Sequence, residues 1–262
     1  MKKLLFLFAF VSVTLHSQTV YRDLTTAKAI AISQNKLILV DFTAEWCYPC
    51  KVMNQELWQS YSFKKRESQF VFVKIDIDVD RKTAAKYRAN LIPRVLLITP
   101  NEDILYDEVG YKGKATYLKD FDALPKNFTR MNAMYSSVDL TKNIKGKPAM
   151  GLGMELSRLG QGISRKKLQN SFLQVSNSYL DNVGKKDLSE QNYQLKEATE
   201  LLNLAYLGEY KKVTLGMEKI YREDNSLHNY ILAYCYKNQG DKIKYQAYYD
   251  KIKSPTLLAK LD

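Results

Sequence analysis

The sequence has few of the side chains that bind metal ions. Its 262 residues include three cysteines and two histidines. A structural zinc site needs four ligands, usually supplied as two pairs. Cys47 and Cys50 are three positions apart, but no second pair accompanies them, and His228 lies far away in the sequence. We therefore expect no metal site and no other cofactor.

Long apolar runs are missing after the first residues. Lys2 and Lys3 precede an uncharged apolar run, Leu4–Leu15, which is too short to span a bilayer comfortably. This pattern is typical of a secretory signal peptide, and the small Ser17 suits the position before a cleavage site. We expect residues 1–17 to be a signal peptide cut near Ser17/Gln18. The remaining chain would then be exported to the periplasm or another extracytoplasmic compartment. An uncleaved anchor is the alternative.

Acidic residues are outnumbered, and the net charge is +12. Loss of residues 1–17 removes Lys2 and Lys3 and leaves +10. The basic residues are spread along the chain and interleaved with acidic ones, which is typical of a solvated surface. An exported protein rarely meets nucleic acid, so we expect no nucleic-acid partner.

The cysteine pair lies in a setting that favours redox chemistry. The stretch Trp46–Cys50 follows an apolar run, Leu37–Phe42, that predicts a buried strand, and it precedes a predicted helix, Lys51–Tyr61. The first sulfur then lies over a helix N-terminus, where unpaired amides stabilise a thiolate. The thiolate is the form that attacks disulfides.

The third cysteine, Cys235, is predicted to be inert. It lies in an apolar helical stretch, Tyr230–Tyr236. A buried thiol is a more common role for such a residue than a second redox centre.

The first half of the chain predicts alternating helices and strands. Their order indicates a mixed sheet with helices on both faces. The expected helices are Asp23–Asn35, the one that follows the cysteines to Tyr61, Arg81–Arg88 and Lys114–Leu124; the expected strands are Leu37–Phe42, Phe70–Asp76, Val95–Ile98 and Ile104–Val109.

The second half predicts helices only. Residues 128–154 contain Gly146, Pro148, Gly151 and Gly153 and are interpreted as a linker or irregular segment, and residues 155–262 as an all-α domain. Gly208 and Gly240 each close a helix, 32 residues apart. This spacing is similar to that of tetratricopeptide repeats, while a plain helical bundle fits the sequence equally well. The expected helices are Lys166–Leu180, Gln191–Leu207, Lys211–Tyr221, Leu227–Asn238 and Asp241–Lys253.

Residues 18–127 resemble the thioredoxin family. The stretch Leu39–Lys51 resembles the family's active-site strand and loop, with Thr43 and Tyr48 as departures from its usual residues. Val73–Asp78 is similar to the family's central strand, and Ile92-Pro93 falls where the family has a cis-proline. The resemblance implies a thioredoxin-like α/β fold.

The resemblance also implies roles for four residues. Cys47, exposed at the helix start, would be the attacking nucleophile, and the deeper Cys50 would resolve the mixed disulfide. Asp41 would accept the Cys50 proton, and Lys74 would temper the raised pKa of that buried carboxyl. The alternatives are an Asp41 exposed at a strand end and a Lys74 that is an ordinary edge lysine.

A second group of residues would contact substrate. Trp46 would shield the disulfide and offer an apolar face to clients, next to Tyr48 and Pro49. Ile92 and Pro93 would pair with an extended client segment. Pro93 could instead be an ordinary trans proline that starts a strand, and Trp46 could serve core packing alone.

Taken together, these features predict an exported thiol–disulfide oxidoreductase that exchanges disulfides with client proteins. The absence of histidine between the cysteines, Pro49 before Cys50 and Ile92 before Pro93 resemble the reducing members and favour a reductase or isomerase. That role requires an electron donor, which we expect to be a membrane protein. The alternative is a binding or scaffold module whose helical domain captures a protein partner through its tyrosines, Tyr206, Tyr210, Tyr230, Tyr234 and Tyr236.

Overall fold

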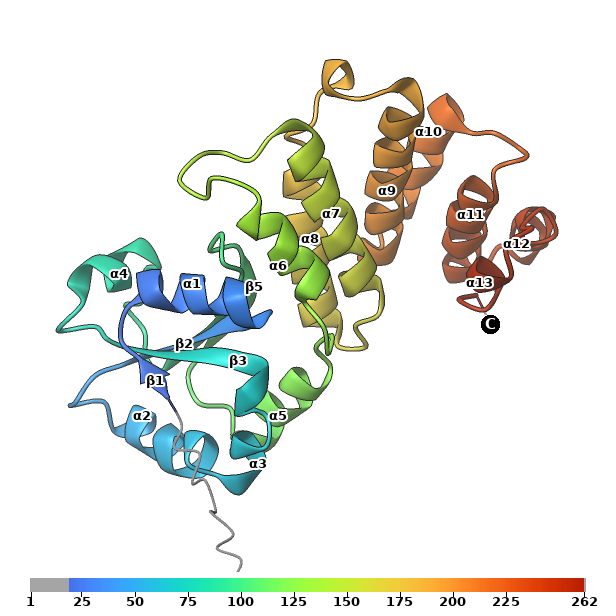
Figure 1. Ribbon diagram of the computed structural model, residues 1–262. Coiled ribbons are helices and arrows are strands. Elements are labelled where there is room, and N and C mark those ends of the chain that lie inside the picture. Colours follow the sequence, from blue (N-terminus) through green and yellow to red (C-terminus); the bar gives the residue numbers. More distant parts are fainter. Residues whose placement is uncertain (1–18, 262) are drawn as a thin grey trace, which may run out of the picture.

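The protein consists of a five-stranded mixed sheet with helices on both faces, followed by an arm of helices (Figure 1). The computed structural model describes residues 19–261. The expected signal peptide, residues 1–17, lies outside them. The α/β architecture followed by helices is the one that the resemblance implies.

The sheet places the strand that leads to the cysteines at its centre. Its strand order is β1-β3-β2-β4-β5. β3 is parallel to β1 and β2, while β4 runs antiparallel to β2 and β5. The strands are β1 (Val20–Tyr21), β2 (Leu37–Thr43), β3 (Phe70–Asp76), β4 (Arg94–Ile98) and β5 (Ile104–Val109). The two-residue β1 was not predicted, because so short a strand leaves no periodic pattern.

Side-chain alternation along the strands divides the core into two layers. In β2, Ile38 and Val40 belong to one hydrophobic cluster with helices α1 (Leu24–Gln34) and α4 (Arg81–Lys86). Leu37 and Leu39 belong to the other, which includes Trp58 and Phe121. Both faces of β2 are thus covered, which explains its nearly unbroken apolar sequence.

The helix after the cysteines differs from the prediction of one helix to Tyr61. Helix α2 spans Tyr48–Met53 and passes into a π-helical turn, η1 (Asn54–Trp58), in which the Gln59 amide donates to the Asn54 carbonyl. A separate helix, α3 (Tyr61–Lys64), then begins because the Ser60 side chain accepts from the Phe63 amide as an N-cap. A 3₁₀ turn, η2 (Glu67–Gln69), leads into β3.

Residues 128–154 are not the predicted irregular linker. They contain helix α6 (Thr129–Ser136) and most of α7 (Gly146–Gln161), so the predicted boundary at residue 155 falls inside a helix. The glycines were misread as helix breakers. A Cβ atom on Gly153 would lie 2.7 Å from the Leu180 side chain and 3.0 Å from the Ser176 carbonyl, so glycine lets α7 approach α8 (Lys166–Leu180) closely.

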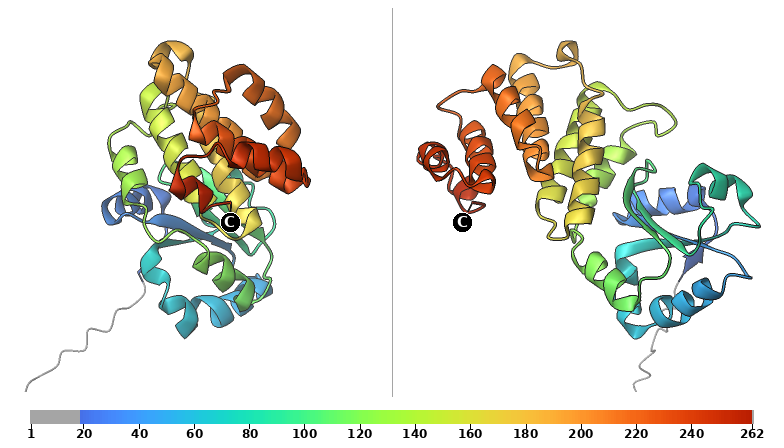
Figure 2. Two further views of the ribbon diagram at one scale, coloured as in Figure 1. Left: turned by 90° about the vertical axis from the view of Figure 1, so that its right-hand side faces the viewer. Right: turned by 180° about the vertical axis from the view of Figure 1, so that it is seen from behind.

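The core of the sheet continues into these helices. One hydrophobic cluster joins Leu97 of β4, Tyr117 of α5 (Lys114–Asp122) and Leu156 of α7. Polar contacts support the same junction, because Tyr135 of α6 and Tyr179 of α8 both donate to Asp103. Figure 2 shows α6–α8 against the α/β part from two further directions.

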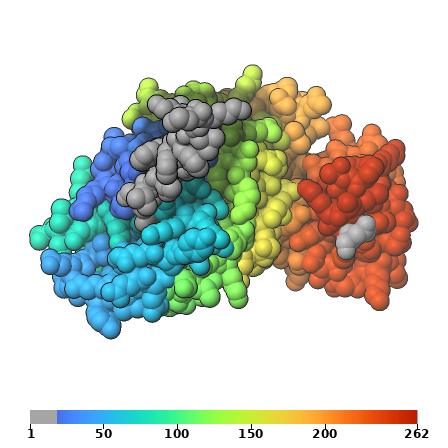
Figure 3. Space-filling model, turned by 60° about the horizontal axis from the view of Figure 1, so that its bottom comes forward, coloured from blue at the N-terminus to red at the C-terminus, as the bar shows by residue number. Residues whose placement is uncertain are grey.

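The last helices form a cluster of their own. They are α9 (Glu190–Leu207), α10 (Tyr210–Ile220), α11 (Ser226–Gln239), α12 (Lys242–Tyr249) and α13 (Pro255–Leu258), and a 3₁₀ turn, η3 (Lys185–Asp187), precedes them. Gly208 and Gly240 end α9 and α11, as predicted, and both adopt the left-handed conformation. The space-filling view shows α7 and α8, green to yellow, between this cluster and the α/β part (Figure 3). A tetratricopeptide-like relation between the helix pairs stays a prediction.

Across residues 19–261, no helix has both the length and the apolar character needed to cross a membrane.

We expect Gly153→Ala to destabilise the protein relative to Gly151→Ala in the same helix. At Gly151 the nearest neighbour of an added Cβ is 3.6 Å away, which is ordinary contact. Overpacking at Gly153 typically costs about 1–3 kcal/mol, while alanine at Gly151 gains up to about 1 kcal/mol of helix propensity. Urea unfolding of both variants checks this. Equal free energies of unfolding would contradict the close packing of α7 on α8.

Candidate active site

The two cysteines form a disulfide at the junction of β2 and α2. Cys47 is the N-cap residue of α2, and its Sγ accepts from the Cys50 backbone N–H at 3.2 Å. Pro49 occupies the first turn, where a missing N–H removes no helical hydrogen bond. The pair therefore lies where the sequence predicted it, with the Cys47 sulfur at a helix start.

The prediction that Cys47 is exposed is wrong for this disulfide form. The exposed fractions of Cys47 and Cys50 are 3% and 4%. Both pack in a small apolar cluster with Ala44, against which Ile77 and Ile92 lie. Their exposed fractions do not distinguish the two cysteines, but their positions do, because Cys50 lines a cavity together with Asn54 and Lys74.

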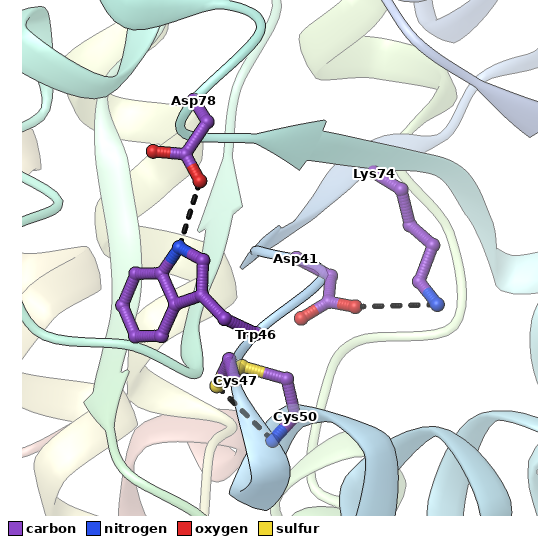
Figure 4. The surroundings of a disulfide bond; sticks show 6 residues. All are labelled: Asp41, Trp46, Cys47, Cys50, Lys74 and Asp78. Carbon is purple, nitrogen blue, oxygen red and sulfur yellow. Dashed lines mark hydrogen bonds and ion pairs between the residues drawn. A yellow bond between two sulfur atoms is a disulfide. The ribbon is translucent and has the colours of Figure 1, made fainter.

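Asp41 lies in the buried centre of the sheet and not at an exposed strand end. The β2–β3 register pairs it with Lys74, and their Oδ2 and Nζ atoms are 3.7 Å apart. Figure 4 shows the carboxyl group between Lys74 and the disulfide in projection. The predicted acid and lysine thus meet because they are opposite partners in a parallel pair, and the edge-lysine alternative for Lys74 is wrong.

Burial raises the pKa of Asp41 to about 6, against the opposing charge of Lys74. The indole N–H of Trp58 also lowers this pKa, although it lies outside hydrogen-bond geometry with the carboxyl group. Neither Asp41 Oδ1 nor Trp58 Nε1 makes a hydrogen bond with any residue between 19 and 261, although both atoms are buried. Asp41 therefore keeps one lone pair free and titrates near neutrality, as a proton acceptor should.

The face above the disulfide carries exposed side chains. Trp46 and Tyr48 are 66% and 75% exposed, and Leu91 is also exposed. The Trp46 indole N–H donates to Asp78 Oδ2 at 2.7 Å, which fixes the ring beside the disulfide (Figure 4). These exposures fit the predicted client-contacting role of Trp46 and not core packing alone.

The proline loop lies on the same site. The Ile92–Pro93 peptide bond is cis, as predicted, and the alternative of a trans proline is wrong. Ile92 packs against the cysteine cluster, Pro93 is buried, and Pro49 is exposed. The structure thus brings the nine site residues predicted from the sequence to one end of the sheet.

Three further residues belong to this site and were missed from the sequence. Asn54 accepts from Lys74, Asp78 holds Trp46, and Trp58 lies against Asp41. Asn54 follows Cys50 by four positions, which is one helical turn, and this spacing could have indicated a shared helix face. Trp58 lies four positions further and continues the same spacing. Asp78 carries no comparable signal, because a turn after β3 places it.

The other predicted features lie away from the disulfide. Cys235 is buried, and burial raises its pKa to about 12, so it has the environment of an inert thiol. The described part of the chain contains no group of three or more side chains that could hold a metal ion.

The tyrosines of the alternative binding surface pack on one another. Tyr206 and Tyr230 join their hydroxyl groups at 2.7 Å, and the rings of Tyr206 and Tyr234 stack. All five tyrosines belong to or pack against the core of α9–α13. Their packing gives the partner-capture alternative no support.

The site combines a buried disulfide at a helix start, a buried carboxyl group beneath it and a neighbouring cis-proline. These features define the class of thiol–disulfide oxidoreductases. Comparison with known proteins agrees. The family model described as thioredoxin-like matches residues 19–100. The thioredoxin of Buchnera aphidicola subsp. Baizongia pistaciae (strain Bp) is 38% identical over 94 residues, covering 36% of this chain and 83% of the relative. The chain therefore belongs to the thioredoxin family.

Other similarities cover a comparable share of the chain. The thioredoxin of Mycobacterium bovis (strain ATCC BAA-935 / AF2122/97) is 34% identical over 95 residues, which are 36% of this chain and 79% of that protein. The solution structure of a thioredoxin from Thermus thermophilus is 22% identical with a TM-score of 0.37, covering 40% of this chain and 85% of that one.

We expect Asp41→Asn to stabilise the oxidised protein at pH 7 and to have little effect at pH 4. Between the ordinary pKa of 3.8 and the folded value of about 6, the folded protein keeps a proton that the unfolded chain has lost. The free energy of unfolding therefore falls as pH rises through this window. At about 1.4 kcal/mol per tenfold change in proton affinity, the loss is about 3 kcal/mol.

Urea unfolding of wild type and variant at both pH values measures this difference. Glu45→Gln, at an exposed carboxyl near the site, is the control and should change neither value by more than about 0.5 kcal/mol. An Asp41→Asn protein less stable than wild type at pH 7 would show that burying the charged Asp41 carboxylate does not destabilise the fold.

Proposed function

We propose that this protein is an exported thiol–disulfide oxidoreductase that reduces or isomerises disulfides in client proteins. The observation that supports reduction of clients, and not their oxidation, is the burial of Cys47 and Cys50 in an apolar cluster. A desolvated site disfavours a charged thiolate relative to a neutral disulfide. A reduced form that gains little from its thiolate gives its electrons away readily, so the pair acts as a reductant.

The contacts of Cys47 support the same direction. Its Sγ accepts one hydrogen bond, from the Cys50 amide. Within residues 19–261 no hydrogen bond or ion pair joins a cationic side chain to this sulfur, and Tyr48-Pro49 supplies no imidazole. Strong oxidants are strong because their reduced form is stabilised, and this site offers little of that stabilisation.

The positions of the two cysteines assign each of them one step of the disulfide exchange. The Cys47 thiolate attacks one sulfur of a client disulfide, the client's S–S bond breaks, and the other client sulfur leaves as a thiolate. Asp41, as carboxylate, takes the proton of the Cys50 thiol, directly or through a water. The Cys50 thiolate then attacks Cys47, closing the disulfide and releasing the second client thiolate. Two electrons have passed from the dithiol to the client.

The exposed face determines what can enter. Trp46 and Tyr48 present apolar surface beside the disulfide, and Ile92 packs against the cysteine cluster. This suits a client segment in extended conformation with apolar side chains next to its cysteine. Catalytic turnover requires re-reduction of Cys47–Cys50, and for an exported protein the proposed donor is a membrane protein. Export itself is proposed from the basic and apolar pattern of residues 1–17.

The reduction potential of Cys47–Cys50 tests whether the protein reduces or oxidises its clients. Equilibration in dithiothreitol or glutathione buffers, followed by Trp46 fluorescence, should give about −250 mV or lower. A value near about −120 mV would make the protein an oxidant of its clients. No reversible transition would refute the oxidoreductase.

Single cysteine variants test the division of roles. We expect Cys47→Ser to abolish insulin reduction and to trap no client. Cys50→Ser should also abolish turnover but accumulate a mixed disulfide through Cys47, because no second thiol resolves it. Non-reducing electrophoresis with a disulfide-containing client shows the adduct, and Cys235→Ser serves as the control. Adducts on Cys47→Ser but not on Cys50→Ser would reverse the assignment.

A further inference from the structure

We propose that Asn54 is a positioning residue for disulfide exchange. Its side-chain oxygen holds the Lys74 ammonium beside Asp41, at the wall of a cavity that reaches Cys50, and so sets the pH at which Asp41 takes and returns the Cys50 proton. This inference rests on the proposed function and adds to it a residue outside the disulfide and the acid–lysine pair.

A short hydrogen bond joins two elements here. Lys74 Nζ on β3 donates to Asn54 Oδ1 at 2.5 Å. The backbone N–H of Asn54 donates to the Cys50 and Lys51 carbonyls, because Asn54 is the C-cap of α2. One residue therefore ties the helix that carries Cys50 to the lysine on the strand opposite Asp41.

The geometry places the ammonium at an intermediate distance from the acid. Lys74 Nζ lies 3.7 Å from Asp41 Oδ2, close enough for charge attraction but beyond hydrogen-bond length. A direct bond would hold Asp41 as a carboxylate and weaken it as a base, while a remote ammonium would leave the buried carboxyl protonated. Asn54 is the group that fixes Lys74 between these two positions.

A cavity gives this arrangement access to water. An open hollow of about 400 Å³ is lined by Cys50, Asn54 and Lys74. Asp41 itself is buried, whereas Lys74 and Asn54 are partly exposed. A proton that leaves Asp41 for solvent can therefore pass along the wall that Asn54 and Lys74 form, on the opposite side from the client-facing Trp46.

Other charged and titratable groups surround the pair without replacing this contact. Lys51, Glu45 and Asp76 line the same cavity. The pKa of Tyr117 on α5 is raised first by burial and then by nearby carboxylates, Asp41 among them. Asp76 accepts from the Asp78 backbone amide. Of these groups, Lys74 is the one that lowers the pKa of Asp41 by its charge.

The test is a titration of the Asp41 carboxyl carbon by NMR in the oxidised full chain, with the signal assigned by Asp41→Asn. In Asn54→Ala, and in Asn54→Leu, which keeps the side-chain volume, the ammonium has no oxygen to hold it and moves into the cavity water. We expect the Asp41 midpoint to rise by about 0.5 pH units or more. The acid limb of the insulin-reduction profile should move the same way, lowering the rate at pH 6 about twofold.

Two controls separate positioning from general disturbance. Gln55→Ala changes an exposed neighbour on the same cavity and should move neither midpoint. In a Lys74→Met background, Asn54→Ala should produce no further shift, because Asn54 acts through Lys74.

An unchanged or lowered Asp41 midpoint in both Asn54 variants would overturn the proposal, and so would an equal shift in the Lys74→Met background. If the wild type reduces no insulin at any pH, the proposed function fails, and the placement of Lys74 by Asn54 is then decided by the NMR titration alone.

Discussion

The direct pairing of Asp41 with Lys74 across two parallel strands is the constraint on which the rest of the site depends. It places a carboxyl group in a layer that is otherwise apolar, beneath the disulfide. The central position of β2 keeps that carboxyl out of water, and the neighbouring ammonium keeps its pKa within reach of neutrality. A buried carboxyl group in an apolar core is costly, here by about 3 kcal/mol of stability above neutral pH. Its pKa near neutrality suits the role of a base that we propose for it.

The surrounding core has to hold this arrangement rigid. Trp58 is the centre of an aromatic group with Phe63, Phe72 and Phe121, and the same indole faces Asp41. The π-turn Asn54–Trp58 carries both Trp58 and the residue that holds Lys74. This turn therefore connects the aromatic core to the contact that holds Lys74.

The helices that follow the thioredoxin-like part of the chain pack directly against it. α7 and α8 share the hydrophobic cluster of the sheet, and Tyr135 and Tyr179 converge on Asp103 at the turn between β4 and β5. Figure 1 shows these helices at the β5 side, away from the start of α2. They stabilise the α/β part from the side opposite the disulfide and leave the client-facing surface open.

Much of the α/β part could be predicted because its signals are local: the apolar run of β2, the cysteine spacing and Ile92-Pro93 each lie within a few residues. The sequence by itself predicted the cysteine pair, the buried acid and the succession of the four longer strands along the chain. Only the tertiary structure decided that Cys47 is buried, that residues 128–154 are helical and that Asn54 holds Lys74. Each of these depends on what another element places nearby. A glycine read from the sequence indicates a helix break, but Gly153 lies inside α7 because Leu180 packs closely against it. Lys74, the partner of Asn54, lies 20 residues away on β3.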